Sequence, residues 1–250
     1  MDFSIPDTYT TYRKEVIAFA QSKLQDDIIA RDQAGEFPRA LWQHCADFGI
    51  QGLAATTDYG GPADEIDLMR SVMAMEALGY GCPDNGLTLA LNAQMWTVQA
   101  IISIFGTHEQ KMQFLKPMAT GEMLGAHALT EPASGSDTFS MAMTAEKTEG
   151  GYLLNGHKAL ITLAPIADMA LVLAKTKPEL KQWGVSAFLV DLHQAGVQRS
   201  AVQDKMGCRT VPIGELVFTD CFVPEANRLG KEGAGFSTVS YTHLTLPTIA

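Results

Sequence analysis

The feature that most constrains the fold is a change of hydrophobic period near Gly121. Before it, apolar residues recur at three- and four-residue steps, which is the pattern of helices with one buried face. After it, short apolar runs alternate with Gly, Pro, Asp and Asn, which is typical of strands joined by turns. Helices followed by strands predict an α+β protein with separate layers. We expect an N-terminal helical bundle, residues 1–120, and a small antiparallel β-barrel-like or sandwich domain, residues 121–229.

Glycine, proline and other turn residues divide the helical half into separate periodic segments. The segment 85–105 is the most hydrophobic, so we expect it at the centre of the bundle. Thr107 and Gln110 have the spacing of a capping box, which predicts that a helix begins there. The expected helices cover residues 9–34, 39–48, 65–78, 85–105 and 107–118.

The strand half is predicted to consist of short strands separated by turn residues. Asn155-Gly156 predicts a hairpin turn between two of them, because this dipeptide favours the positive φ angles of tight hairpins. The expected strands cover residues 123–129, 142–148, 152–155, 158–162, 169–175, 185–190 and 215–219.

The charge balance narrows the classes of partner. The formal net charge is -10, the pI is near 5.0, and Lys and Arg form no local run. This argues against a nucleic-acid surface and favours small molecules or other proteins. We expect no apolar run near the roughly 20 residues of a membrane span, and residues 1–4 lack the basic start of a signal peptide. The sequence thus predicts a cytoplasmic protein with no membrane partner.

The cysteines indicate neither a disulfide framework nor a metal site. They are dispersed, with no Cys-x-x-Cys and no His at ligand spacing. Free Cys behaves as a small apolar residue, so we interpret them as buried or free thiols. These residues are Cys45, Cys82, Cys208 and Cys221.

Two segments of the strand half carry the candidate chemistry. Residues 130–137 read Thr-Glu-Pro-Ala-Ser-Gly-Ser-Asp, which places hydroxyls and backbone amides on one turn after a strand. From spacing alone, a well-capped turn explains this segment. Residues 154–162 read Leu-Asn-Gly-His-Lys-Ala-Leu-Ile-Thr, which by itself is a hairpin leading into a strand that ends in a hydroxyl.

Taken together, the two segments resemble the acyl-CoA dehydrogenase family of flavoenzymes. The family signature Thr-Glu-Pro-x-x-Gly-Ser-Asp is unbroken at 130–137, and the segment 154–162 is similar to the family's second flavin-contacting segment. A third match runs through 205–224, and residues 230–236 resemble the glycine-rich link to the next helix. The resemblance extends over nearly everything from residue 9 to residue 236.

The resemblance implies an FAD-dependent oxidoreductase. Such an enzyme would oxidise a saturated acyl thioester, either acyl-CoA or an acyl carrier protein, to the α,β-unsaturated thioester by proton abstraction and hydride transfer to FAD. It would pass electrons to an acceptor and assemble as a homodimer or homotetramer. Residues 78–86 and 92–96 look more like members that act on carrier-protein-bound acyl groups. Acyl chain length and the electron acceptor stay open.

The resemblance also implies cofactor contacts for individual residues. Thr130 would face the pyrimidine side of the isoalloxazine, where negative charge gathers on reduction, so that donors there favour the reduced state. Leu129 would contribute backbone beside the ring. Thr162 would place its hydroxyl near the flavin nitrogen that accepts hydride. Gly135 and Ser136 would face phosphates, and Ser136 would also serve the thioester substrate.

The implied cofactor set includes His127, Leu160 and Ile161, and two of these depart from the family pattern. Many members have tryptophan in place of Leu160 and an aromatic or other bulky residue in place of His127, so ring stacking on the flavin is weaker or differently supplied. We expect His127 to be a satisfied polar neighbour and not a proton donor. Glu131 and Asp137 are expected to support their own loop.

The larger departure is at the end of the sequence. Complete family members continue into a helical bundle that carries the catalytic carboxylate, whereas residues 238–250 contain a proline, many β-branched residues and no carboxylate. We expect 230–250 to link to a missing helical domain and 238–250 to be a foreign or frame-shifted tail, with no catalytic residue in the chain. Two alternatives stay open: a truncated, non-catalytic flavin- or thioester-binding fragment, and an oxidase or monooxygenase on the same scaffold.

Overall fold

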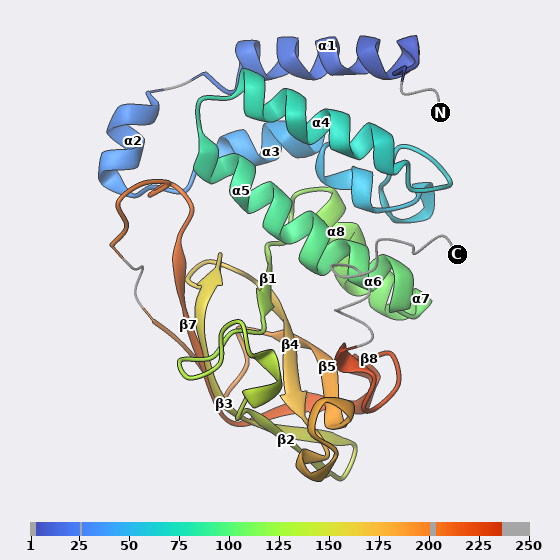
Figure 1. The fold of residues 1–250 in the computed structure, drawn as a ribbon, viewed down its shortest axis with the longest axis vertical. Coiled ribbons are helices and arrows are strands. Elements are labelled where there is room, and N and C mark those ends of the chain that lie inside the picture. The colour runs from blue at the N-terminus through green and yellow to red at the C-terminus, as the bar shows by residue number, and fades with distance from the viewer. Residues whose placement is uncertain (1–3, 26, 201–203, 237–250) are drawn as a thin grey trace.

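A computed structural model describes residues 4–25, 27–200 and 204–236. Helices occupy one part of the molecule and strands the other, at the top and bottom of Figure 1 respectively. The predicted α+β class, with helices first and strands second, is confirmed. The segment 238–250, which the sequence set apart, lies outside the described residues.

The helices lie close to the predicted segments. The capping box is present, since Gln110 N donates to Thr107 Oγ1 and Thr107 N donates to Gln110 Oε1. The segment 85–105 is helical throughout, with a π-helical stretch inside it. The helices are α1 (Asp7–Lys23), α2 (Ile28–Ala34), α3 (Arg39–Asp47), α4 (Leu68–Gly81), α5 (Asn85–Gln94), π-helical η3 (Met95–Gln99), α6 (Ala100–Phe105), α7 (His108–Gln110), π-helical η4 (Lys111–Leu115) and α8 (Lys116–Ala119).

The prediction of one helix over residues 9–34 was wrong. The chain forms α1 and α2 in its place. The second helix begins after Asp27, whose side chain accepts a hydrogen bond from Ala30 N at 3.1 Å. Aspartate at this position satisfies an amide that has no partner within the helix, and it therefore favours a new helix start over continuation.

The expectation that no apolar segment is as long as a membrane span also needs correction. By length and composition, the helix Asn85–Phe105 could cross a membrane, with a mean hydropathy of 1.3. Half of that hydropathy window is buried inside the protein, as in a core helix. The helix lies between other helices and the sheet (Figure 1).

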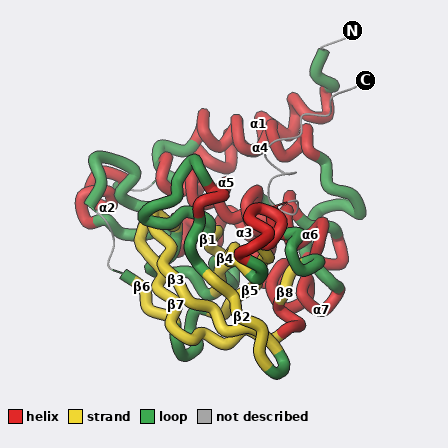
Figure 2. The backbone as a smooth tube through the Cα atoms, turned by 60° about the horizontal axis from the view of Figure 1, so that its bottom comes forward, coloured by secondary structure: helices red, strands yellow, loops and turns green. Residues whose placement is uncertain are grey.

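The strands form one mixed sheet, eight-stranded within the described residues, in the order β6-β7-β3-β2-β4-β5-β8, with β1 paired to β4. Most pairings are antiparallel, as predicted, but β1 and β2 both pair with β4 in parallel. Figure 2, turned so that the bottom of Figure 1 comes forward, shows the strands in the lower half of the picture. The strands are β1 (Gly125–Ala128), β2 (Thr144–Thr148), β3 (Gly151–Thr162), β4 (Met169–Lys175), β5 (Val185–Asp191), β6 (Val197–Arg199), β7 (Ile213–Pro224) and β8 (Arg228–Leu229).

The predicted hairpin turn at Asn155-Gly156 was wrong. Both residues lie inside β3, which continues to Thr162 and pairs with β7 along most of its length. The register shifts between Leu154 and Gly156, which marks a bulge. A Cβ at Gly156 would come within 2.6 Å of the Met143 side chain, so glycine permits a close approach of the loop before β2.

Three fully buried glutamines connect the helical part to the sheet. Gln51 donates to Trp42 O at 2.9 Å, and Gln99 donates to Gln51 O at 3.0 Å. Gln94 donates to Gln99 Oε1 at 3.2 Å and accepts a hydrogen bond from Gly125 N, the first residue of β1, at 2.8 Å. The amide groups therefore fix the central helix against the strand that leads to the signature loop.

A buried ion pair forms a second connection. Arg31 Nη1 lies 2.5 Å from Asp84 Oδ2, and both side chains are almost fully buried. The other Asp84 oxygen accepts from Gly86 N and Leu87 N at the start of α5, and from Thr210 Oγ1 at 2.7 Å. One carboxylate thus joins α2, α5 and the loop before β7.

Candidate functional site: a hydroxyl-lined hollow between helix and sheet

The two segments with candidate chemistry, residues 130–137 and 154–162, meet at a hollow of about 220 Å³. The hollow lies between the central helix, residues 85–105, and strands β1 and β3. It brings together most of the residues predicted as cofactor contacts: His127, Leu129, Thr130, Leu160, Ile161 and Thr162. The remaining lining residues are Ala93, Thr97 and Gly125.

The strand β1 delivers Leu129 and Thr130 to this hollow. It pairs in parallel with β4, with Gly125 opposite Met169. At its end, the carbonyl of Thr130 accepts a hydrogen bond from Ala159 N at 2.9 Å. This bond fixes the signature loop directly beside β3, although the two segments are far apart in the sequence.

Glu131 holds the signature loop in shape. Its backbone exchanges two hydrogen bonds with Ser134, which closes a tight turn around Pro132. Its buried carboxylate accepts from Ala142 N at 2.5 Å and from Met143 N at 3.0 Å. Burial acts to raise the pKa of this carboxyl, but the amide donors and a nearby lysine outweigh it and lower the pKa below its ordinary value. The carboxylate is therefore ionised and serves as an acceptor.

Gly135 and Ser136 lie outside the hollow. Both are exposed, and a side chain at Gly135 would meet no atom within 4 Å. Ser134 Oγ donates to Asp137 O at 2.6 Å, so the turn is closed by its own residues. The structure therefore separates the predicted phosphate-contacting pair from the predicted ring-contacting residues.

Leu160 has an unusual backbone conformation for a leucine. Its φ is 57°, in the left-handed region, and its side chain is 61% exposed at the edge of the hollow. The register of β3 against β7 shifts between Lys158 and Ile161, and this irregularity turns Leu160 outward. Strained backbone of this kind is found most often at binding sites.

We expect Leu160→Gly to stabilise the protein by about 0.5–1 kcal/mol, because glycine adopts positive φ without steric cost. Leu160→Ala is the matched control, since it removes nearly the same side chain but keeps a Cβ. Urea unfolding of both variants measures the effect. An equal gain for Leu160→Ala would contradict the explanation by backbone strain.

Besides Gly125 of β1, two residues of the hollow were not predicted from the sequence, Ala93 and Thr97. They come from the most hydrophobic helix, four positions apart, and Thr97 Oγ1 donates to Ala93 O at 2.5 Å. Small residues at positions i and i+4 lie on one face of a helix and leave room beside it. That spacing, in a helix predicted to be central, was the signal that could have identified them.

The donors of the hollow suit a flat polar heterocycle. Among the described residues, none is hydrogen-bonded to the hydroxyl of Thr130 or of Thr162, so both are free to bind a ligand. The apolar side chains of Leu129 and Ile161 lie beside them. None of the lining residues is an aspartate or a glutamate. The hollow can therefore hold and polarise a ligand, but its lining supplies no carboxylate base.

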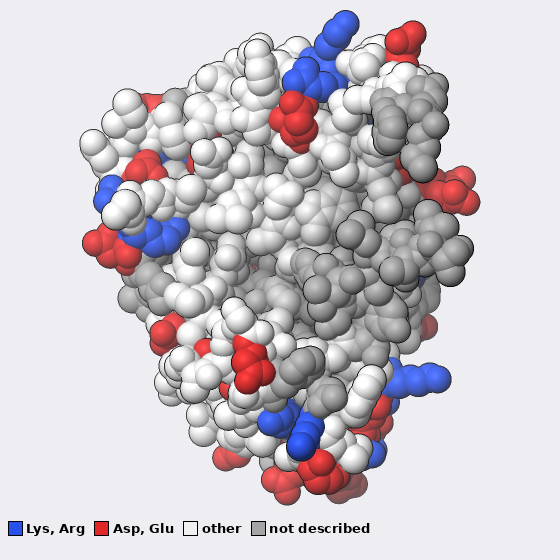
Figure 3. All heavy atoms as spheres, in the orientation of Figure 1, with Lys and Arg blue, Asp and Glu red and all other residues white. Residues whose placement is uncertain are grey.

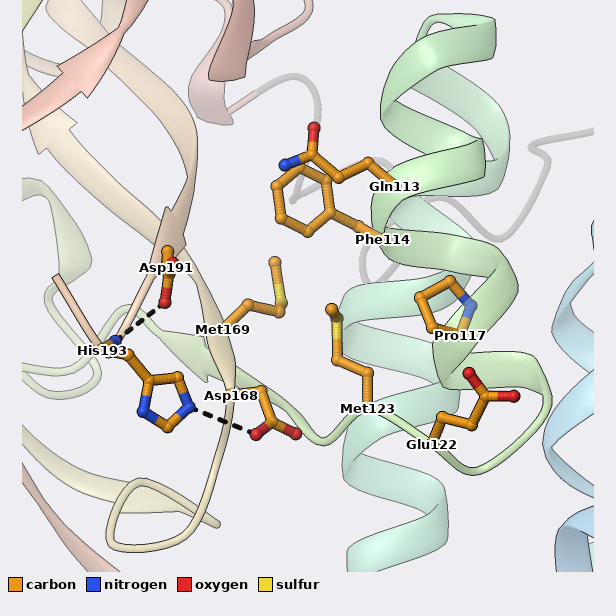
Figure 4. A pocket seen from close by; sticks show the side chains of 9 residues that line it. All are labelled: Gln113, Phe114, Pro117, Glu122, Met123, Asp168, Met169, Asp191 and His193. Carbon is orange, nitrogen blue, oxygen red and sulfur yellow. Dashed lines mark hydrogen bonds and ion pairs between the residues drawn. The ribbon is translucent and has the colours of Figure 1, made fainter.

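A larger hollow of about 370 Å³ lies elsewhere, between η4 and α8 on one side and the ends of β4 and β5 on the other (Figure 4). None of the predicted site residues lines it. Its polar groups include Glu122, Asp168 and Asp191, and His193 Nε2 lies 3.3 Å from Asp168. Three carboxylates make it unsuited to an anionic ligand. Within the described part of the chain, no group of three or more His, Cys, Asp or Glu is placed to hold a metal ion.

The charged surface gives no competing site on the face seen in Figure 3. Acidic and basic side chains of the described residues are scattered towards its rim, and they form no broad basic area on this face. The hydroxyl-lined hollow is therefore the site where sequence motif and geometry coincide.

Comparison with known proteins places the chain in a family. Residues 6–122 match the model of the acyl-CoA dehydrogenase N-terminal domain, and residues 126–221 match that of the acyl-CoA dehydrogenase middle domain. The chain belongs to the acyl-CoA dehydrogenase family, as its two motifs predicted.

Its relatives include an L-prolyl-(peptidyl-carrier protein) dehydrogenase of Pseudomonas fluorescens, which is 36% identical over 94% of this chain and 61% of the relative. A crystal structure of the prolyl acyl carrier protein oxidase AnaB has a TM-score of 0.92 at 38% identity, covering 96% of this chain and 63% of that one. The FAD complex of PigA has a TM-score of 0.92 at 34% identity, covering 97% and 63%. The chain spans about three fifths of the length of the curated relatives it matches.

Proposed function

We propose that this chain forms the flavin-binding part of an FAD-dependent oxidoreductase that dehydrogenates an acyl thioester. The observation that carries the proposal is the hollow in which the two family motifs meet, with Thr130 and Thr162 both presenting hydroxyls that no described residue uses. The FAD complex of a relative with the same fold supports the choice of ligand. Bound FAD would supply the hydride acceptor for the reaction.

The roles of the residues follow from their positions. Thr130 and Thr162 would donate hydrogen bonds to the cofactor, and donors that act on developing negative charge favour its reduced state. Ala93, being small, leaves room for a ring beside the helix. The lining of the hollow includes no carboxylate, so the base that removes the α-proton would come from elsewhere.

The proposed substrate is an acyl group bound to a carrier protein, and the proposed partners are that carrier and an electron acceptor. Support comes from the relatives, two of which are prolyl-carrier-protein dehydrogenases at 36% identity. We further propose that the whole protein is a cytoplasmic homodimer or homotetramer. Acyl-CoA is the alternative form of the thioester.

A titration of the purified protein tests the proposal. FAD is added first, and its absorbance and fluorescence report binding. A panel that includes prolyl-carrier protein and butyryl-CoA is then added under anaerobic conditions. We expect FAD to bind and the carrier-bound substrate to perturb the flavin spectrum more strongly than the CoA ester. Failure to bind FAD would contradict the proposal.

The two hydroxyls are tested by isosteric substitution. We expect Thr130→Val and Thr162→Val each to weaken FAD binding about three- to tenfold, because each removes one hydrogen bond worth about 0.5–1.5 kcal/mol. Thr148→Val, at an exposed position of β2, is the matched control. Fluorescence titration measures the dissociation constants, and unchanged values in both variants would exclude these hydroxyls as ligands.

A second candidate function is oxidation with oxygen as the acceptor. It is favoured by the similarity to an oxidase, AnaB, at 38% identity. The two functions differ in the fate of the reduced flavin. Rapid reoxidation by oxygen in the presence of the unsaturated thioester would favour the oxidase, and slow reoxidation the dehydrogenase.

A further inference from the structure

We propose that the buried ion pair of Lys158 and Glu131 is the positioning element of the cofactor hollow. It holds the Leu129–Thr130 backbone against β3, so that the wall of the hollow is formed before the ligand binds. The inference rests on the proposed flavin site. It concerns two residues that lie behind the lining and not in it.

The Lys158 side chain connects the two motifs. It extends from β3 and is 0% exposed. Its Nζ donates to Leu129 O at 3.0 Å and to Glu131 Oε1 at 2.8 Å. The next residue, Ala159, donates its N–H to Thr130 O at 2.9 Å. Three consecutive residues, 129–131, are therefore held by two consecutive residues of β3.

The Glu131 carboxylate extends this arrangement to a third segment. It accepts from Ala142 N and Met143 N as well as from Lys158 Nζ. One carboxylate and one ammonium thus fix the signature loop, the segment before β2 and the middle of β3 relative to one another. Both charges are desolvated, and such pairs are stable only where hydrogen bonds satisfy their remaining donors and acceptors.

The energetics favour a positioning role over a simple contribution to stability. Burial lowers the pKa of Lys158, and the Glu131 carboxylate opposes that effect without abolishing it. A buried pair of this kind gains little over two apolar side chains of similar volume. An apolar pair could not hydrogen-bond to Leu129 O or to the amides of Ala142 and Met143. The ion pair makes these bonds and thereby fixes a single conformation of the loop.

The test compares two variants with the unaltered protein. In Lys158→Met, the Leu129 carbonyl loses its donor and Glu131 is left as an unpaired buried charge. We expect FAD binding at least about tenfold weaker, equivalent to the loss of a hydrogen bond to a charged group. Because this variant can also lose stability, Glu131→Gln with Lys158→Met removes both charges and is expected to stay folded, yet to bind FAD equally weakly.

Two further measurements separate positioning from stability. Hydrogen exchange should show faster exchange of the Ala159 amide in the double variant, with the amides of the central helix unchanged. At saturating FAD, the reduction potential of the bound flavin should become more negative than in the unaltered protein, since the Thr130 donors are no longer held in place. Lys147→Met is the matched control, because Lys147 pairs with Glu225 at 3.7 Å on the exposed side of the same sheet.

The outcomes are distinguishable. If the unaltered protein binds FAD and the double variant binds it as tightly with the same potential, the positioning role is overturned while the flavin site stands. If the unaltered protein binds no FAD, the proposed function fails, and the positioning role that depends on it fails too. Weaker binding with a more negative potential in the double variant, and not in Lys147→Met, supports the inference.

Discussion

Replacing Asp84 by alanine is expected to reduce the free energy of unfolding by about 3–5 kcal/mol, because it breaks a buried ion pair by removing the carboxylate. Arg31 and Asp84 lie 2.5 Å apart and are almost fully buried. The change also removes the side chain that caps α5 and the acceptor for Thr210. Urea unfolding followed by circular dichroism would measure the loss.

The matched control for this prediction is Asp67→Ala. Asp67 caps α4 by accepting from Arg70 N at 2.9 Å and also accepts from the Tyr9 hydroxyl at 3.1 Å, but no buried arginine depends on it. Loss of a cap alone costs about 1 kcal/mol. If Asp84→Ala were no more destabilised than Asp67→Ala, the buried pair would add nothing beyond the cap. Asp84→Asn, which keeps an oxygen but loses the charge, should fall between them.

Gln94→Met is expected to cost about 2–4 kcal/mol and to weaken cofactor binding, because it leaves buried polar groups without partners. Methionine has nearly the length of glutamine and fills its space, so the cavity term is small. The orphaned groups are Gly125 N and Gln99 Oε1. Since Gly125 begins β1 and lines the hollow, the effect should reach the site.

Unfolding by urea and titration with FAD would measure both effects of Gln94→Met. The control is Gln113→Met, at an exposed position of η4. A free energy of unfolding within about 0.5 kcal/mol of that of the unaltered protein, the range of ordinary surface substitutions, would show that the hydrogen bonds of Gln94 add no measurable stability. A loss of stability without a change in FAD affinity would confine its role to the fold.

Local patterns predicted the elements that depend on local chemistry. The capping box at Thr107 and Gln110 formed because both of its hydrogen bonds lie within four residues. The strand 169–175 was predicted residue for residue, since turn residues bound a short apolar run. The hollow between the two motifs contains the residues that the family resemblance indicated, apart from Gly135 and Ser136.

The failures in the sheet have a common physical cause, which is tertiary contact. Asn155-Gly156 favours a turn in isolation, but pairing with β7 and the close approach of Met143 make it part of a long, bulged strand. The parallel pairing of β1 with β4 joins segments some forty residues apart, and no local pattern encodes it. The Lys158–Glu131 pair was invisible for the same reason, since a buried lysine is defined by what surrounds it.

The π-helical stretch Met95–Gln99 bears on how this chain is compared with others. A π turn accommodates one extra residue in an α-helix, and it rotates every later side chain by about 100° relative to the earlier ones. Thr97 lies in this stretch and lines the hollow, whereas Ala93 precedes it. A homologue without the extra residue would align correctly only with a gap inside this helix, and an ungapped alignment would assign its site residues to the wrong face.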